Sequence, residues 1–386
     1  MIFEHMNKLP LVLALAAWTA SLALSSAAVF EQLGVFVGNP NPANPAAQAG
    51  FDARYTTFIQ SMGQEPRYTD VFVDYTQPIA AWPGNAGWGS GVMKGSAQAN
   101  LIPVVSIGLA DSSVYDHGKR NGDRATAMMN AIGDGQYDDV YNSIIEAFKK
   151  RGYTSMYFRI GWEMNGGWEP WYATGNAASA AAYVHAFQRV ASLAHHAAGI
   201  TIKTVWCPCF LQWNGVDPTS TYAGDDSVDV VGPDMYSPVW CAQPYDWTNH
   251  SPSPSIAAWA ANPANREHYW DYPSGTQWKP TSGWGLPAAL AFCKEHKKPF
   301  ALSETGTGGD DKNKGPIDDD AFPAYLGKRL SAAVADGIAI EYIIIWNLNP
   351  SDGAWLFTDG KKPKAEIAWR EFVKTMAEAL ATHGKS

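Results

Sequence analysis

The sequence predicts an α/β protein, a (β/α)8 TIM barrel in a single domain. Short apolar runs alternate with helical stretches along the chain, and this alternation is typical of parallel strands separated by helices. Eight such runs are present, as a closed barrel of this type requires. The alternative is an open doubly wound sheet, but no glycine-rich phosphate-binding motif follows the first run.

The expected strands are rich in β-branched and aromatic residues, as is typical of strands buried on both faces. In chain order they cover residues 33–37, 71–75, 101–107, 155–161, 201–206, 228–232, 300–303 and 341–346. Helical spacing predicts helices over residues 137–150, 177–198, 284–296 and 321–336. Residues after about 374 are expected to form a last helix and a short tail.

Residues 1–28 have the features of a signal peptide. Lys8 supplies the positive charge, residues 11–24 form an apolar run, and small residues follow at 25–28. The run is too short for a membrane-spanning helix, and the alternative is a buried N-terminal helix. We therefore expect a secreted or periplasmic protein, with a catalytic domain over residues 29–386 and no membrane association after the signal is removed.

The composition argues for a neutral partner. The formal net charge is −9 and basic residues do not cluster, which disfavours nucleic acid and anionic polymers. Four cysteines are few for a disulfide scaffold. We expect Cys241 to pair with Cys207 or Cys209, and Cys293 to be a free buried thiol. Neither the spacing of Cys207 and Cys209 nor the acidic segment 310–320 fits a metal site, so we expect no metal.

Two glutamates stand at the ends of expected strands. Glu163 ends the fourth and Glu304 ends the seventh, and each is soon followed by glycine. Carboxylates at strand ends of a barrel meet at its C-terminal face, where barrel enzymes have their active sites. A pair of carboxylates in an aromatic-rich chain is the arrangement that a retaining glycosidase needs.

Arg159 shares one face of its strand with Glu163, because strand side chains alternate. A buried arginine needs carboxylate partners, and Asp74 at the end of the second expected strand is one candidate. We therefore expect Arg159 to support the site without taking part in the reaction. Trp162, Trp168 and Trp171 around Glu163 would provide the apolar surroundings that keep a general acid protonated.

These segments resemble glycoside hydrolase family 26. The letters RIGWEMNGGW (159–168) are similar to the acid/base strand of that family, VDVVGPDMY (228–236) to its sixth strand, and PFALSETG (299–306) to its nucleophile strand. The resemblance covers most of the chain after residue 28, although only these segments and Trp346 are specific. It implies a retaining endo-β-glycanase, usually a β-mannanase, with β-1,3-xylanases and mixed-linkage glucanases among the members.

The resemblance also implies roles for single residues. Glu163 would be the general acid/base and Glu304 the nucleophile. Tyr236 would hydrogen-bond the nucleophile, Trp346 would lie under the sugar that is attacked, and Asn165 would line the site beside the acid. The family normally has histidine where this chain has Trp162. This difference marks the chain as a divergent member of the family. It bears on which sugar is bound more than on the catalytic step.

Aromatic side chains stack on the apolar faces of sugar rings, and the chain has 17 tryptophans. Core packing accounts for many of them. Besides Trp346, the tryptophans expected to bind substrate are Trp206, Trp168, Trp171, Trp213 and Trp240. Asp234 shares a strand end with Tyr236 and is a further candidate, with a loop cap as the alternative. The aromatic-rich segment 237–283 is expected to be a long loop that shapes the cleft.

The sequence as a whole predicts a secreted retaining endo-β-glycosidase that acts on a β-linked polysaccharide. A β-mannan is the first substrate to expect, and a bacterial exopolysaccharide, β-1,3-xylan or mixed-linkage glucan are the alternatives. No cofactor is expected, and we expect a monomer. A non-catalytic glycan-binding barrel is the rival from another class. A metal-dependent barrel would need several His and Asp residues at strand ends, where this chain has aromatic residues and glutamates.

Overall fold

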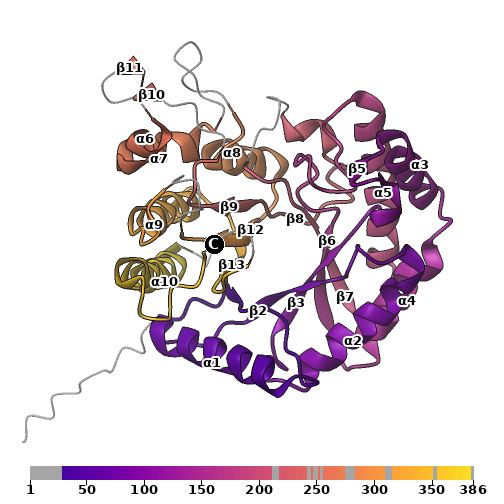
Figure 1. Ribbon diagram of the computed structural model, residues 1–386, viewed down its shortest axis with the longest axis horizontal. Helices are drawn as coiled ribbons and strands as arrows, with labels where there is room; N and C mark the ends of the chain where they lie inside the picture. Colours follow the sequence, from indigo (N-terminus) through magenta and orange to yellow (C-terminus); the bar gives the residue numbers. More distant parts are fainter. Residues whose placement is uncertain are drawn as a thin grey trace, which may run out of the picture.

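The protein is a (β/α)8 TIM barrel, which confirms the predicted fold class (Figure 1). The computed structural model describes residues 28–210, 217–240, 245–246, 251–252, 255–273, 283–308, 315–350 and 354–383. The predicted signal peptide lies outside this part except for Ala28, so the domain bounds and the export of the protein stay predictions. No helix of the described residues combines the length and apolar character needed to cross a membrane.

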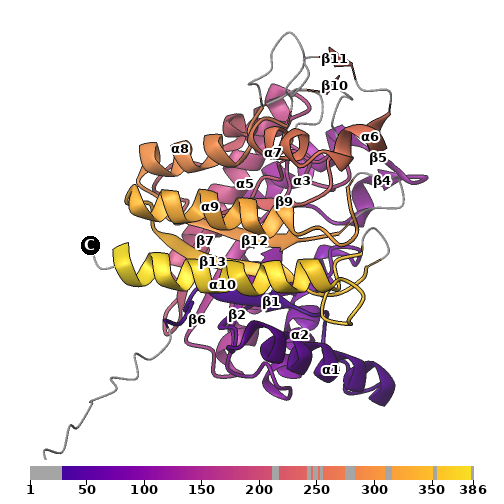
Figure 2. The same cartoon turned by 90° about the vertical axis from the view of Figure 1, so that its left-hand side faces the viewer.

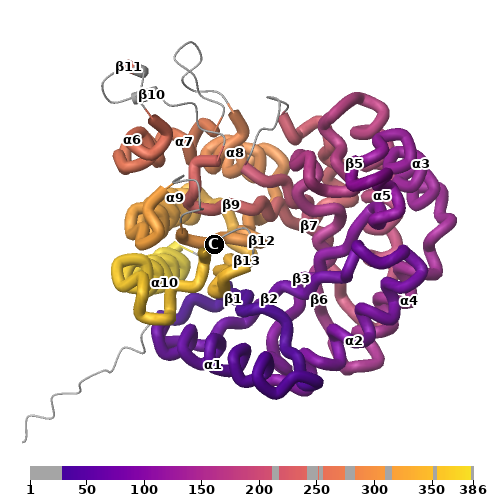
Figure 3. Tube along the Cα trace, viewed as in Figure 1, coloured from indigo at the N-terminus to yellow at the C-terminus, as the bar shows by residue number. Residues whose placement is uncertain are grey.

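The barrel strands pair in parallel and close in a ring. They are β1 (Leu33–Phe36), β2 (Tyr68–Phe72), β3 (Ile102–Ile107), β6 (Ser155–Ile160), β7 (Thr201–Trp206), β8 (Val230–Val231), β9 (Asp234–Tyr236), β12 (Phe300–Gly306) and β13 (Ile340–Trp346). The ring closes where β1 pairs with β13, with Phe36 opposite Trp346. Figure 3 shows these first and last strands side by side in indigo and yellow.

The sixth barrel strand consists of β8 and β9. Val231 of β8 pairs with Phe300 at the start of β12, whereas Asp234 of β9 pairs with Glu304 near its end. Gly232 lies between the two halves, where a Cβ atom would come within 2.7 Å of the Val205 side chain. Only glycine fits this close approach without moving its neighbours.

Helices surround the barrel. They are α1 (Pro45–Met62), α2 (Trp82–Lys94), α3 (Gly122–Gly133), α4 (Asp138–Lys149), α5 (Ala177–His195), α6 (Ile256–Ala261), α7 (Pro263–Asp271), α8 (Leu286–His296), α9 (Ala321–Ala335) and α10 (Pro363–His383). The side chains of Asn44, Asn121 and Asn176 accept backbone N–H bonds at the starts of α1, α3 and α5, which fixes where these helices begin. Figure 2 shows α8, α9 and α10 side by side along one flank.

Short elements complete the connections between strands. Two antiparallel pairs join β4 (Tyr115–Asp116) to β5 (Lys119–Arg120) and β10 (Tyr245–Asp246) to β11 (Ser251–Pro252). The expected loop 237–283 is wrong in part, because its described residues include the helices α6 and α7. The Ser255 hydroxyl caps α6 and the Asn262 side chain caps α7, and such caps define short helices that apolar periodicity does not reveal.

Two further boundaries differ from the sequence expectation. Strand β2 ends at Phe72, because the Asp74 carboxylate accepts bonds from the backbone N–H and the hydroxyl of Thr76 and turns the chain. Helix α10 begins at Pro363, well before residue 374. Proline is favoured in the first turn of a helix. Pro363 therefore indicates where α10 begins, although the apolar periodicity does not.

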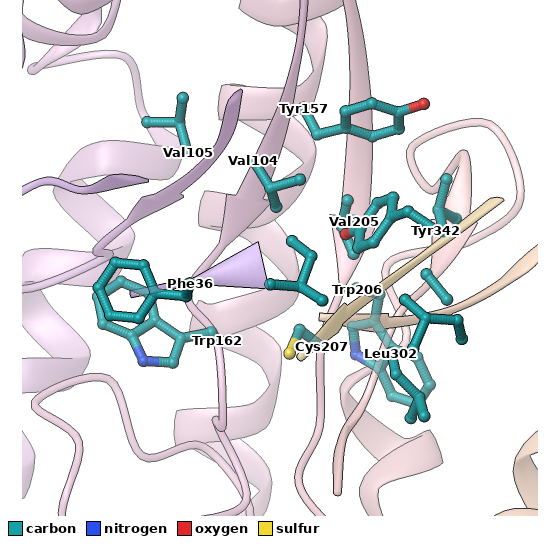
Figure 4. Packing of buried hydrophobic residues seen from close by; sticks show 14 of the residues in the cluster. Phe36, Val104, Val105, Tyr157, Trp162, Val205, Trp206, Cys207, Leu302 and Tyr342 are labelled. Atoms are coloured by element: carbon teal, nitrogen blue, oxygen red, sulfur yellow. The ribbon is translucent and has the colours of Figure 1, made fainter. Parts of the chain in front are cut away.

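Side chains of the barrel strands fill the barrel interior. Figure 4 shows part of this core, including Val104, Leu302 and Tyr342, all of which are fully buried. Phe72, Ser106 and Arg159 lie in register on β2, β3 and β6, so these three side chains point to the same face of the sheet. Arg159 contacts side chains of β9 and β12, which identifies that face as the barrel interior.

Candidate active site

Glu163 follows β6 at the mouth of the barrel. Its backbone has a φ of 50°, a left-handed conformation that non-glycine residues adopt mainly where surrounding contacts enforce it. One such contact is the hydrogen bond from its N–H to the Cys207 carbonyl oxygen at 2.7 Å. The side chain is half-buried, and its Oε2 accepts a hydrogen bond from Trp168 Nε1 at 2.7 Å. The Glu163 carboxyl group is thus held at the mouth, within reach of solvent.

Glu304 lies in β12 and is almost fully buried. Its Oε1 accepts a hydrogen bond from Arg159 Nη1 at 2.7 Å, and its Oε2 accepts one from the Tyr236 hydroxyl, also at 2.7 Å. Hydrogen bonds from a cation are stronger than those from a neutral donor. The two glutamates therefore stand in different surroundings.

The charges of both carboxylates act on Tyr236. Burial raises the pKa of Tyr236, and the charges of Glu304, Asp234 and Glu163 raise it further. A narrow pocket is lined by Glu163, Asp234, Tyr236, Trp240 and other residues. Tyr236 and Trp240 therefore line the same pocket as Glu163, and their contact with a ligand stays a prediction.

Arg159 holds the inner part of the site together. The side chain is fully buried and contacts Ser106 Oγ at 3.1 Å and Cys207 Sγ at 3.2 Å, besides its ion pairs with Asp234 and Glu304. Burial alone would lower the pKa of Arg159, but its acidic neighbours, Asp234 foremost, raise it. A supporting role for Arg159 was expected, but the proposed partner Asp74 is wrong. Asp74 is exposed and bonds to Thr76.

Asp70 is an inner residue that the sequence reasoning missed. It lies on β2, is buried, and its Oδ2 accepts a hydrogen bond from Trp346 Nε1 at 3.1 Å. Burial raises the pKa of Asp70, Arg159 opposes the shift, and Glu304 adds to it. An acidic residue in the middle of the apolar run 68–72 was the available signal, because it shares a strand face with Phe72.

Asp234 also belongs to this inner layer. Its side chain is buried and forms an ion pair with Arg159. Burial raises the pKa of Asp234 and the Arg159 guanidinium opposes the shift. Asp234 was predicted to bind substrate. It reaches the narrow pocket, but its main contact is the guanidinium below the site.

Four aromatic rings surround the outer part of the site. Tyr236 lies 4.5 Å from Trp355, 6.0 Å from Trp240 and 6.1 Å from Trp346, measured between ring centroids. Trp240 and Trp346 are half-buried, which leaves part of each ring available to a ligand. Trp355 was not predicted, since it lies in the connection between β13 and α10, outside every expected element.

Three residues predicted to bind substrate are buried. Trp206 is fully buried and packs on Trp284 and Phe292. Val205 is in register with the inward-facing Arg159, so Trp206, the next residue, faces the helices. Trp171 is also fully buried, and its indole donates to the Trp162 carbonyl oxygen.

Asn165 is the third of these residues. Its Oδ1 accepts a hydrogen bond from the backbone N–H of Cys209 and its Nδ2 donates to the carbonyl oxygen of the same residue. The side chain is buried, so it joins the loops after β6 and β7. Trp162 is buried too, with its ring 4.5 Å from that of Trp171 and 5.7 Å from that of Phe72. Trp162 thereby packs between these two rings, and its supporting role stays a prediction.

The cysteine predictions have mixed outcomes. Cys293 is a free buried thiol, as predicted. Cys207 is also free, which excludes it from the predicted disulfide. Cys241 lies outside the described residues, as does Trp213. Across the described parts of the chain, no group of three or more His, Cys, Asp or Glu side chains is arranged to hold a metal ion.

A further buried carboxyl group lies close to Glu163. Glu169 is almost fully buried, and its Oε2 has no hydrogen-bond partner among the described residues. Burial raises the pKa of Glu169, the charge of Glu163 raises it further, and Arg159 opposes the shift. Sequence reasoning did not single out Glu169. Its position between Trp168 and Trp171 was the only signal.

The substitution Glu169→Gln is expected to stabilise the protein at neutral pH. A carboxyl with a raised pKa in the folded state costs stability as the pH rises above its unfolded value of about 4.3, and glutamine has no such cost. Thermal melting should show an increase in Tm of about 2–4 °C at pH 7. The increase should shrink as the pH falls through about 4.3 and vanish near pH 3, where the carboxyl is protonated in both states.

The control is Glu295→Gln, which changes an exposed glutamate on α8. It should leave Tm nearly unchanged at both pH values, since exposed substitutions have small effects. A Glu169→Gln protein that melts below wild type at pH 7 would show that the ionised carboxylate has a stabilising partner.

Solved structures show the same fold. The chain is similar to GH26C from Muricauda sp. MAR_2010_75, with 14% identity, a TM-score of 0.51, and coverage of 89% of this chain and 86% of that one. An engineered protein has 15% identity and a TM-score of 0.50, with 89% and 68% covered. A β-mannanase from a symbiotic protist of the termite Reticulitermes speratus has 16% identity and a TM-score of 0.47, with 89% and 87% covered.

The other two comparisons found nothing: no protein-family model and no curated protein matches the chain. The fold is therefore like that of a glycoside hydrolase family 26 protein. At such low identity this likeness concerns the fold, and function has to be argued from the site.

Proposed function

We propose that this protein is a retaining glycoside hydrolase that cleaves a β-linked polysaccharide within the chain. One observation carries the proposal: the buried carboxylate of Glu304 is bonded to Arg159 and Tyr236, whereas that of Glu163 lies at the half-open mouth beside Trp168. Retaining glycosidases need one carboxylate that stays ionised to attack the sugar and another that exchanges protons.

The mechanism follows from these surroundings. Glu163 protonates the glycosidic oxygen as Glu304 attacks the anomeric carbon, which gives a glycosyl-enzyme ester on Glu304 and releases the first product. Glu163 then takes a proton from a water molecule that attacks the same carbon, and the ester bond to Glu304 breaks. The two displacements retain the anomeric configuration. No cofactor is needed for either step.

The aromatic rings around the mouth provide the binding surface. Sugar rings stack on the faces of tryptophan and tyrosine, and Trp168, Trp240 and Trp346 keep part of their surface exposed. We propose a neutral β-glycan as substrate, because the formal net charge is −9 and basic residues do not cluster in the sequence. A β-mannan is the first candidate. An exopolysaccharide, β-1,3-xylan and mixed-linkage glucan follow.

Activity on a polysaccharide panel tests the proposal, with the substitution Glu163→Ala as its key variant. This variant should lose about 10²–10⁴-fold in kcat with poor leaving groups, the usual contribution of a general acid. Azide should restore turnover of an activated aryl glycoside, because a small anion can enter the space of the lost carboxylate and needs no general base. Nuclear magnetic resonance of the product should show a glycosyl azide of retained configuration.

The matched control is Glu295→Ala, on the exposed face of α8, which should hydrolyse every substrate as wild type does. An azide product of inverted configuration would contradict retention. Binding of glycans without hydrolysis of any of them would favour the rival function, a non-catalytic glycan-binding barrel.

A further inference from the structure

A short hairpin contacts the loop that follows Glu163. Strands β4 and β5 belong to the connection between β3 and α3, and their register places Tyr115 directly opposite Arg120. Opposite residues of an antiparallel pair point to the same face. His117 and Gly118 have φ angles of 47° and 78°, as a two-residue turn of type I′ requires. The turn therefore brings the side chains of Tyr115 and Arg120 together.

Tyr115 and Arg120 bind three alternate carbonyl oxygens of that loop. The Tyr115 hydroxyl donates to the carbonyl oxygen of Trp168 at 2.8 Å. Arg120 Nε donates to the carbonyl oxygen of Pro170 at 2.8 Å, and its Nη2 donates to that of Tyr172 at 2.9 Å. The guanidinium also lies 5.7 Å from the centroid of the Tyr172 ring. Hydrogen bonds from a charged donor are stronger than neutral ones, so the hairpin holds one edge of the loop firmly.

The same loop carries the indole that bonds Glu163. Trp168 Nε1 donates to Glu163 Oε2 at 2.7 Å, and the tryptophan is 42% exposed. Its ring lies against Gly166, where a Cβ atom would come within 2.3 Å of the indole. A general acid has to lie within hydrogen-bond reach of the atom that it protonates, and a misplacement of about 1 Å can cost about 100-fold in rate.

A buried carboxyl group gives the loop a reason to open. Glu169 follows Trp168, is almost fully buried, and its Oε2 has no hydrogen-bond partner among the described residues. A carboxylate is more stable in water than in such a place, and the nearby charge of Glu163 disfavours ionisation further. Movement of the loop outward would expose Glu169 to water. The bonds from the hairpin oppose that movement.

We propose that Arg120 is a positioning residue for Glu163, the general acid of the proposed mechanism. Together with Tyr115 it clamps the loop 168–172 and so keeps Trp168 bonded to the Glu163 carboxyl group. The clamp itself rests on the contacts of the hairpin, whereas its effect on the reaction rests on the proposed function. Arg120 acts through the backbone of the loop and is not a catalytic residue.

Three substitutions and one control test the clamp. Arg120→Met removes both donors and keeps an apolar side chain beside Tyr172. Arg120→Lys keeps the charge but not the planar set of donors that reaches two carbonyl oxygens, and Tyr115→Phe removes only the hydroxyl group. The control is Arg124→Met, which removes another arginine that binds the hairpin. Arg124 forms an ion pair with Asp116 in which both side chains are about half exposed.

The first measurement is kcat/KM for aryl β-glycosides of the sugar that the polysaccharide panel identifies. A dinitrophenyl group leaves without an acid, whereas an unsubstituted phenyl group needs one. Arg120→Met should lose about 10–100-fold on the phenyl glycoside but stay within about twofold of wild type on the dinitrophenyl glycoside. Arg120→Lys and Tyr115→Phe should show smaller losses of the same kind, and Arg124→Met should behave as wild type.

The second measurement is amide hydrogen exchange over residues 164–173, which needs no catalysis. The backbone N–H of Glu169 donates to Gly166 and that of Tyr172 donates to Glu169, both within the loop. Loss of two charged hydrogen bonds in Arg120→Met should speed exchange of these amides at least about tenfold. Arg124→Met should leave their exchange unchanged. If Arg120→Met does not fold, Tyr115→Phe serves for both measurements.

Equal losses of Arg120→Met on both aryl glycosides would show that Arg120 supports the fold without positioning the acid. Wild-type leaving-group dependence, or unchanged exchange over residues 164–173, would also overturn the proposal. The proposed function can fail separately. Faster exchange of the loop in a protein that hydrolyses no glycoside would keep the clamp and reject the proposed function. Hydrolysis that requires Glu163 but is insensitive to Arg120→Met would keep the function and reject the positioning role.

Discussion

The substitution Glu304→Gln is expected to lower kcat by about 10⁴–10⁶-fold, the range in which removal of a covalent nucleophile falls. An amide oxygen is a far weaker nucleophile than a carboxylate, so the first displacement should nearly stop. Substrate binding should change little, because glutamine has the shape of glutamate and its carbonyl oxygen can still accept from Arg159 or from Tyr236. The measurement is kcat and KM on the polysaccharide that the panel identifies.

A labelling experiment locates the ester bond. An activated 2-deoxy-2-fluoro glycoside of the matching sugar should modify wild type once, and mass spectrometry of the peptides should place the sugar on Glu304. Glu163→Ala should still be labelled, since an activated leaving group needs no acid, whereas Glu304→Gln should not. Undiminished hydrolysis by Glu304→Gln, or a label on another residue, would reject Glu304 as the nucleophile.

The substitution Arg159→Met should have the largest effect on stability. It leaves the carboxylates of Asp234 and Glu304 buried without their cation, and removing one partner of a buried ion pair costs about 3–5 kcal/mol. Burial raises the pKa of Asp234. The loss should therefore be largest at neutral pH and smaller in acid, where protonation of the Asp234 carboxyl removes part of the uncompensated charge. Denaturant unfolding at pH 7 and pH 4.5 measures both effects.

The control for Arg159→Met is Arg67→Met. Arg67 forms an ion pair with Glu31 in which both side chains are more than half exposed, and such pairs contribute about 0–1 kcal/mol. Arg159→Lys should fall between the two, because lysine keeps the charge but lacks the planar set of donors that reaches four partners. Equal unfolding free energies for Arg159→Met and wild type would show that the buried cluster reorganises to exclude its charge.

Much of the fold could be read from the sequence because the barrel strands are short, apolar and regularly spaced. All the expected strands overlap strands of the barrel, and the two strand-end glutamates lie at one site. The errors came from turns and caps. Asp74 turns the chain through its own side chain, a local bond that does not show in an apolar pattern.

Site residues could be predicted where the alternation along a strand determines which way a side chain points. They could not be predicted where the contact joins residues far apart in the sequence. The alternation of side chains along a strand places Arg159 and Tyr236 inside the barrel. The same rule places Trp206 on the helix side, so it argues against the prediction that Trp206 binds substrate. The partners of Arg159 lie on β9 and β12, far along the chain. Trp355 contacts Tyr236 from a connection that has no apolar periodicity. No local sequence pattern therefore predicts this contact.

Because β1 pairs with β13, the barrel can close only after the last strand has formed. One of the two neighbours of β1 is the last barrel strand, β13. The backbone N–H and C=O groups on that side of β1 therefore have no strand to pair with until β13 has been synthesised. Contacts between such distant segments slow folding, because a long loop has to close before the pairing gains any free energy. A chain that lacks its last barrel strand should therefore fail to fold as a unit, and its exposed strand edges would favour aggregation.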